Sequence, residues 1–149
     1  MKNIFKIPAY VGIILKKDNS VLLVQRHSSS TWMPHYWNFP GGLLEENESL
    51  TMAAARETHE EVEVSVMPSD FTFAHMIHVH ANISKKSDGI LGCYFITEQW
   101  TGIPQNGEPD KHSDVAWFDL DNLPERITEH ALLAIESIKS GKKYHEDGW

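Results

Sequence analysis

The stretch GLLEENESLTMAAARETHEEVEV, residues 42–64, decides how this sequence is interpreted. Residues three and four positions apart lie on one face of an α-helix. Glu57, Glu60 and Glu61 would therefore direct their carboxylates toward one patch. Hard divalent cations prefer oxygen ligands such as carboxylates. The stretch predicts a helix over residues 49–62 that carries a magnesium site, with manganese as the alternative ion.

The charge pattern of this helix supports a bound cation. Like charges three or four positions apart destabilise an isolated helix by roughly 0.2–0.5 kcal/mol per pair. Arg56 can neutralise one carboxylate, and a cation would offset the others. Before the helix, Pro40, Gly41 and Gly42 allow a backbone turn that larger residues would resist, so a backbone carbonyl could also face the cation. A glutamate-rich helix face that only contacts solvent is the alternative interpretation.

A longer pattern of glycine, glutamate and arginine surrounds the patch. Its members, at fixed spacings, are Gly42, Glu48, Arg56, Glu57, Glu60 and Glu61. They match the Nudix box, G-x5-E-x7-R-E-U-x-E-E-x-G-U with U aliphatic, and the chain therefore resembles the MutT-like Nudix hydrolases. That family cleaves nucleoside diphosphates linked to another group, so the resemblance implies a hydrolase that acts on a nucleotide.

Two positions depart from the box. Thr58 stands where an aliphatic residue is usual, and Glu63 stands where the late glycine is usual. Thr58 should lie on the buried side of the helix. Glu63 falls near the helix end, where glycine normally provides the left-handed terminating conformation. These departures bear on helix termination more than on the chemistry, because no charged residue of the box is replaced.

We assign a role to each of the charged residues as a mechanistic hypothesis. Magnesium would bridge the substrate's phosphates and activate a water. Its ligands would be Glu57, Glu60, Glu61 and the carbonyl of Gly41. Arg56 and Glu48 would form an ion pair that orients the helix and its ligands. A carboxylate, Glu57 or Glu108, would accept the proton of the water, and the sequence leaves the choice between them open.

A second segment extends the resemblance over most of the chain. Residues 106–111, followed by Trp117 and Phe118 and then by residues 123–125, look like a segment found in a nucleotide-hydrolysing branch of the family. In that branch an acidic residue outside the box lies on the loop over the metal site, and Glu108 is the matching candidate. An ordinary solvated glutamate on a surface loop is the alternative, although loops carry function disproportionately.

Two basic residues are candidates for binding substrate phosphate. Arg26 ends the second predicted strand, and in MutT-like proteins an arginine at this place can meet phosphate. A guanidinium suits phosphate because it donates two parallel hydrogen bonds. Lys111 is a weaker candidate for the same task. An arginine that merely lies at the surface after a strand is the alternative.

Histidines and aromatic residues add less specific signals. His78 and His80 would share one strand face, which suits a polar surface or part of a substrate pocket better than a zinc site. His59 would point away from the carboxylate patch. The aromatic residues that could either stack a base or pack in the core are Trp32, Tyr36, Trp37 and Trp100.

Composition indicates one compact enzyme domain over residues 1–149. This length lies near the modal domain size, and a hydrophobic content of 41% excludes disorder as the default. The net charge of −8 argues against binding to nucleic acid polymers, which need a positive patch.

Cys93 is the single cysteine, so we expect a buried, inert thiol and no intrachain disulfide. Without a signal-like start or an apolar run of ~20 residues, we expect a cytoplasmic protein with no membrane segment.

Strands and helices alternate along the sequence. Apolar runs predict strands over residues 9–15, 21–25, 71–83, 89–100 and 114–120. A second amphipathic helix is predicted over residues 128–140 and stops at Gly141, whereas Asn47 or Ser49 would cap the helix of the box. Residues 142–149 would pack back on the domain. Helices on both faces of a mixed β-sheet form an α/β/α sandwich, and the Nudix resemblance implies the same arrangement.

The expected reaction is hydrolysis of a nucleoside triphosphate, normal or oxidised, to a monophosphate and pyrophosphate. This choice rests on the resemblance of the segment around Glu108. Cleavage of ADP-ribose or of a nucleotide sugar is the enzymatic alternative. A sensor that binds nucleotide without hydrolysis is the third, and the intact Glu57, Glu60 and Glu61 argue against it. The expected partner is a small nucleotide, and the expected state is a monomer or a homodimer.

Overall fold

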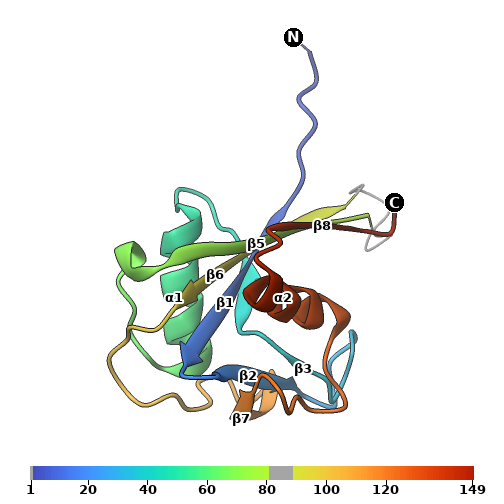
Figure 1. The fold of residues 1–149 in the computed structure, drawn as a ribbon. Helices are drawn as coiled ribbons and strands as arrows, with labels where there is room; N and C mark the ends of the chain where they lie inside the picture. The colour runs from blue at the N-terminus through green and yellow to red at the C-terminus, as the bar shows by residue number, and fades with distance from the viewer. Residues whose placement is uncertain (1, 81–88) are drawn as a thin grey trace.

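The computed structural model describes residues 2–80 and 89–149, which form a mixed sheet between two helices (Figure 1). The strands are β1 (Ala9–Lys17), β2 (Ser20–Arg26), β3 (Trp37–Asn38), β4 (Gly41–Leu43), β5 (Thr72–Val79), β6 (Ile90–Thr97), β7 (His112–Asp119) and β8 (Tyr144–Asp147). The helices are α1 (Leu50–Val62) and α2 (Glu129–Ser140), with a short 3-10 helix over Pro68–Asp70. The strand order is β3-β2-β1-β6-β5-β8, with β4 beside β1 and β7 beside β2.

Alternation along β1 assigns the two helices to opposite faces of the sheet. Val11, Ile13 and Leu15 are buried in one core cluster together with apolar residues of α1. Ile14 belongs to a second cluster that contains residues of α2. Successive side chains of a strand point to opposite faces, and Figure 1 shows the helices on either side of β1. Because β1 runs parallel to β6 and antiparallel to β2, the predicted α/β/α sandwich with a mixed sheet is confirmed.

The longer predicted strands are present, with shifted ends. β1 and β2 meet in a hairpin that turns at Asp18, which has a φ of 52°. β7 begins at His112, ahead of the predicted start at residue 114. The strand predicted over residues 71–83 is observed as β5, which ends at Val79. Residues 81–83 lie outside the described residues.

Three short strands escape the sequence prediction. β3, β4 and β8 contain 2, 3 and 4 residues. Alternation of apolar and polar residues needs a longer run to be recognised. β3 and β4 also flank Pro40, which the sequence marks as part of a turn. These strands exist because longer neighbours supply their hydrogen-bond partners, a property that their own residues do not encode.

Both ends of α1 are defined by identifiable contacts. The Ser49 side chain accepts a hydrogen bond from the Met52 amide at 3.2 Å, so Ser49, and not Asn47, is the N-cap. At the other end, Glu63 adopts the left-handed conformation with a φ of 57°, and its amide donates to the His59 carbonyl at 3.1 Å. Glutamate thus performs the terminating turn that glycine provides in the box. Thr58 is fully buried, as predicted.

The second helix and the C-terminal tail also follow the prediction. Thr128 caps the start of α2, and Gly141 ends it with a φ of 76°. After this glycine, β8 pairs in parallel with β5, so residues 142–149 do pack back on the domain. Cys93 is buried, and burial raises the pKa of its thiol, in agreement with an inert role. Across residues 2–80 and 89–149, neither helix has the length and apolar character needed to cross a membrane.

Candidate active site

Arg56 lies at the centre of the ion pairs on α1. Its Nε and one terminal nitrogen donate to the two carboxylate oxygens of Glu48 at 3.0 and 2.8 Å. Its other terminal nitrogen donates to Glu57 Oε1 at 2.8 Å and to Glu60 Oε2 at 3.4 Å. The hydrogen bonds from Arg56 lower the pKa of the Glu48 carboxyl. The two-pronged contact fixes the helix relative to the segment before it, which is the geometry expected of the Arg56–Glu48 pair.

Glu57 is buried against the turn that precedes α1. Its side chain is only 10% exposed. A Cβ placed on Gly42 would come within 2.1 Å of Glu57 Oε1, so a residue with a side chain would displace this carboxylate. Burial raises the pKa of Glu57, and the neighbouring Arg56 opposes that shift. The glycine of the box therefore acts by leaving space for a carboxylate.

Glu61 is the most strongly perturbed carboxylate of the box. Its side chain is 7% exposed, and burial raises its pKa to about 8. The Gly41 amide donates to Glu61 Oε2 at 3.1 Å, which places the Gly41 peptide beside the carboxylate. His112 Nε2 lies 3.9 Å from the same oxygen, but burial lowers the pKa of His112 to about 4, so this ring is neutral at pH 7. The Gly41 amide and the charge of Lys111 oppose this rise in the pKa of Glu61, whereas Glu57 accepts a hydrogen bond from the Arg56 guanidinium.

The loop before β7 brings Glu108 to the same region. The amide of Gly107 donates to the Glu61 carbonyl at 2.9 Å, so the loop is fastened to the last turn of α1. The charge of Glu108 contributes to the raised pKa values of both Glu57 and Glu61, because like charges disfavour ionisation. Lys111 Nζ lies 2.9 Å from Glu108 Oε2. The loop thus places one acid and one base beside the carboxylates of the box.

Glu60 occupies a more peripheral position than Glu57 and Glu61. Its side chain is 46% exposed and reaches back to Arg56. His59, at the preceding position of the helix, is also exposed. The helix face therefore divides into two buried carboxylates and one that borders solvent.

The donor set agrees with a hard divalent cation in its chemistry. Glu57 and Glu61 offer oxygen atoms, and burial opposes the ionised form of each, a cost that a bound cation would offset. Within the described parts of the chain, no set of three or more His, Cys, Asp or Glu side chains is already gathered for a metal. The residues fit magnesium by type and position, and the closed ligand cage typical of a structural metal site is not formed.

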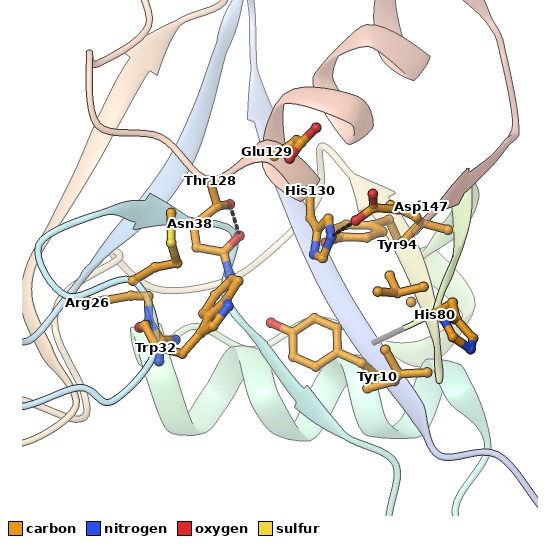
Figure 2. A pocket seen from close by; sticks show the side chains of 15 residues that line it. Tyr10, Arg26, Trp32, Asn38, His80, Tyr94, Thr128, Glu129, His130 and Asp147 are labelled. Atoms are coloured by element: carbon orange, nitrogen blue, oxygen red, sulfur yellow. Dashed lines mark hydrogen bonds and ion pairs between the residues drawn. The ribbon is translucent and has the colours of Figure 1, made fainter. Parts of the chain in front are cut away.

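A pocket of about 550 Å³ lies beside the start of α2 (Figure 2). Its wall includes residues of β1, β2, β3, β5 and β6, the start of α2 and the end of β8. Tyr10 and Arg26 connect the pocket to the box. A Cβ on Gly41 would meet the Tyr10 hydroxyl at 2.5 Å. Burial lowers the pKa of Arg26, and the nearby Tyr10 and Glu61 oppose that shift. Arg26 also lines a smaller, more polar hollow together with Lys111.

The side chain of Arg26 is held in place by the loop after β2. Its Nε donates to the Trp32 carbonyl at 2.6 Å, and its guanidinium carbon lies 4.8 Å from the centre of the Trp32 ring. A cation over an indole face is attracted by the ring electrons. Arg26 is therefore anchored at the junction of two hollows, and is not a free surface arginine.

The structure separates the aromatic residues that the sequence grouped together. Trp32 lines the pocket. Trp37 instead packs against Phe118 with ring centres 4.7 Å apart, and Trp100 stacks on Trp117 at 5.7 Å. Tyr36 does not line the pocket. Of the four candidates, only Trp32 is placed to stack a base there.

Several pocket residues were missed by the sequence analysis. They include Tyr10, Asn38, Tyr94, Thr128, His130 and Asp147. Asn38 carried a usable signal, since it stands two positions before Pro40 in the turn that leads to the box. Its Oδ1 accepts a hydrogen bond from the Thr128 hydroxyl at 2.9 Å, which leaves the amide nitrogen available as a donor. The others carry no signal of their own because separate strands and α2 bring them together.

The strand histidines pack against the C-terminal tail, and within residues 2–80 and 89–149 they belong to no group of three or more possible zinc ligands. The rings of His78 and His80 both pack against Trp149, with ring centres 4.6 and 4.7 Å away. His80 also lines the pocket. The two histidines thus serve packing of the tail and one pocket wall.

Comparison with known proteins agrees with this geometry. The sequence matches the NUDIX domain model over residues 6–138. A MutT-like protein of Streptomyces ambofaciens is 26% identical over 128 residues, which cover 85% of this chain and 73% of that protein. The 8-oxo-dGTP diphosphatase of Escherichia coli (strain K12) is 26% identical over 121 residues, covering 80% of this chain and 88% of the relative. Phosphatase NudJ of the same strain is 27% identical over 143 residues, covering 94% and 88%.

Solved structures share the fold. A MutT NUDIX hydrolase from Burkholderia pseudomallei superimposes with a TM-score of 0.78 at 24% identity, covering 89% of this chain and 98% of the other. A NUDIX hydrolase from Nitrosomonas europaea superimposes with a TM-score of 0.72 at 24% identity, covering 93% of both chains. At these identities the likeness concerns the fold alone.

Proposed function

This chain belongs to the Nudix hydrolase family and is a Nudix pyrophosphohydrolase, and we propose that its substrate is a nucleoside triphosphate, normal or oxidised. The proposed reaction adds water across a phosphoanhydride bond and releases a nucleoside monophosphate and pyrophosphate. The relative named 8-oxo-dGTP diphosphatase supports this substrate class. The proposed cofactor is magnesium, for which manganese can substitute.

One observation carries the proposal: Arg26 and Tyr10 join the pocket to the carboxylates of the box. The pocket, with Trp32 on its wall, accommodates a flat heterocycle. Arg26 lies between this pocket and the smaller hollow that contains Lys111. A nucleotide whose base occupies the pocket would extend its phosphates past Arg26 toward Lys111 and the box. This path places the phosphates where positive side chains and a metal would meet them.

The residues of the box divide the chemical work. Glu57, Glu61, Glu60 and the carbonyl of Gly41 would hold the magnesium. When bound, this ion would act as a Lewis acid on the phosphate oxygens and would lower the pKa of a water. Arg56 orients Glu57 and, through Glu48, fixes α1 against the segment before it. Glu57 or Glu108 would accept the proton of the attacking water, and Arg26 would bind a phosphate.

The cellular setting forms part of the proposal. We place the enzyme in the cytoplasm, as a monomer or a homodimer, with a free nucleotide as its partner. The net charge of −8 disfavours nucleic acid polymers, whereas a free nucleotide can enter together with its magnesium. Light scattering on the purified protein would determine the number of subunits.

The test is product identification on a panel of substrates. Purified protein is incubated with normal and oxidised nucleoside triphosphates, ADP-ribose and nucleotide sugars, each with magnesium and with a chelator. We expect magnesium-dependent release of pyrophosphate and a nucleoside monophosphate from a triphosphate. Two monophosphate products from ADP-ribose or a nucleotide sugar would replace our substrate class. Nucleotide binding without turnover would replace the enzyme proposal by a sensor.

A further inference from the structure

The last strand of the sheet lies beyond the part of the chain that matches the family. The family match ends at residue 138, within α2, whereas β8 spans Tyr144–Asp147. β8 pairs in parallel with β5, with Ile77 opposite His145 and Val79 opposite Asp147. Figure 1 shows this strand at the edge of the sheet, near the C-terminus. The strand thus follows the residues that the family model matches, and its last residue, Asp147, lines the pocket.

Several side-chain contacts hold β8 in place. His75, fully buried on β5, shares a hydrogen bond of 2.6 Å with His145. His145 Nε2 lies 3.6 Å from the Glu136 carboxylate on α2. The indole nitrogen of Trp149 donates to the His78 carbonyl at 3.2 Å. Contacts to both β5 and α2 make β8 a fixed wall, so its pocket-facing residue has a defined position.

Asp147 is that residue, and it contacts a pocket residue of α2. Its Oδ2 accepts a hydrogen bond from His130 Nε2 at 3.0 Å (Figure 2). The His130 ring stacks on Trp32, with ring centres 6.3 Å apart and an angle of 27° between the planes. Trp32 in turn contacts Arg26. A continuous series of contacts therefore runs from the C-terminal strand, across the pocket, to the arginine at the junction with the box.

We propose that β8 is a specificity element of this enzyme, in which Asp147 is a positioning residue that holds His130 against Trp32 and so sets the surface on which the substrate's base stacks. This inference rests on the proposed function, because it takes the pocket to be the base site. It assigns recognition of the base in part to the last strand of the sheet, which follows the residues that the family model matches.

The chemistry of the contact supports this role. An ionised carboxylate only accepts hydrogen bonds, so His130 Nε2 must carry a hydrogen. The contact thus fixes both the tautomer of a neutral His130 and the orientation of its ring. The side chains of His130 and Asp147 are 25% and 37% exposed, so both border the pocket and neither is sealed in the core. A ligand in the pocket can therefore contact the ring that Asp147 orients.

The experiment compares substitutions at Asp147 with a control in the same strand. Asp147→Ala removes the acceptor for His130, whereas Asp147→Asn keeps an oxygen that can accept the same hydrogen bond. Glu146→Ala is the control, because the Glu146 carboxylate accepts a hydrogen bond from the Tyr144 hydroxyl at 2.9 Å and Glu146 is not among the residues that line the pocket. Each protein is assayed for kcat and KM with triphosphates of adenine, guanine, cytosine and uracil.

We expect Asp147→Ala to raise KM about fivefold to tenfold for the preferred base, with kcat within about twofold of the wild type, as suits one lost charge-assisted hydrogen bond. The preference among bases should shrink. Asp147→Asn should restore most of the affinity, and Glu146→Ala should leave both constants unchanged. In the His130→Ala background, Asp147→Ala should have little further effect, because the two residues act as one unit.

Binding without turnover separates this inference from the proposed function. Titration calorimetry with the nucleoside monophosphates, in a chelator, measures occupancy of the pocket whether or not the protein hydrolyses triphosphates. We expect the same loss of affinity in Asp147→Ala. Equal losses of nucleotide affinity in Asp147→Ala and Glu146→Ala would overturn the specificity role even if hydrolysis is observed. A fall in kcat of Asp147→Ala without a change in KM would do the same. Absence of triphosphate hydrolysis in the wild type, with base-dependent binding still lost in Asp147→Ala, would overturn the proposed function alone.

Discussion

The box on α1 and the pocket beside α2 are built in contrasting ways. The box takes Glu48, Arg56, Glu57 and Glu61 from one short segment, and helix periodicity aligns them. The pocket takes its residues from strands and a helix that span positions 10 to 147. The box buries carboxylates with raised pKa values, whereas the pocket is walled by aromatic, aliphatic and histidine side chains. Local sequence thus groups the residues to which we assign the chemistry, and the assembled sheet forms the pocket that we propose binds the base.

The first prediction separates the two regions by their effect on turnover. Glu57→Gln should lower kcat by orders of magnitude, roughly 10²–10⁴-fold, because it removes a buried ligand or base and keeps the side-chain shape. KM should change much less. Steady-state kinetics measures both constants, and circular dichroism checks that the fold is retained. Turnover close to that of the wild type would remove Glu57 from the mechanism.

The second prediction concerns the pH response of the box. The pKa of Glu61 is raised from 4.5 to about 8, so the folded state binds a proton more tightly than the unfolded state does. The contribution of Glu61 to the free energy of unfolding is fully present below pH 4.5. It is lost as the pH rises to about 8, by a few kcal/mol at most. A cation that binds the ionised carboxylate should restore this lost stability. Thermal melts of metal-free protein should therefore show a larger gain on adding magnesium at pH 8 than at pH 5.

Glu61→Gln provides the control for this pH response. It keeps the size of the side chain and cannot ionise, so the dependence of the magnesium effect on pH should largely disappear. An unchanged pH dependence in this variant would assign the effect to other groups.

The third prediction is that His75, near the pocket, makes the free energy of unfolding depend on pH in the opposite sense. Burial lowers the pKa of His75, the residue that fastens β8, from 6.5 to about 4. The folded state thus binds a proton less tightly than the unfolded state, and stability is lost as the pH falls from 6.5 to about 4. At about pH 4 the free energy of unfolding has fallen by about 3 kcal/mol. Urea unfolding at pH values between 7 and 4 measures it, and a smaller slope is expected for His75→Asn than for the wild type.

The smallest expected effect comes from the aromatic wall of the pocket. Trp32→Ala removes the stack with His130 and the contact with Arg26. We expect KM to rise about tenfold, with a modest change in kcat. Trp100→Ala is a matched control outside the pocket, since Trp100 packs on Trp117. A larger effect on kcat than on KM would place Trp32 in the chemical step and weaken the contrast between the regions.

Sequence reasoning recovered the fold where a long periodic pattern was available. The box helix was predicted over residues 49–62 and is observed over Leu50–Val62, because apolar and charged residues repeat with the helical period. The strands β5 and β6 were predicted from their long apolar runs. The short strands β3, β4 and β8 were not found, since their stability comes from partners that are distant in sequence.

The candidate site shows the same division. By itself, the sequence determined the family, the α/β/α class and the box, because helical spacing and cap residues act over a few positions. Only the tertiary structure decided that Glu57 and Glu61 are buried while Glu60 borders solvent, and that Asp147 reaches His130. Such contacts depend on pairing between remote strands. The physical reason is that burial and pocket shape are properties of the packed sheet, to which each segment contributes one or two side chains.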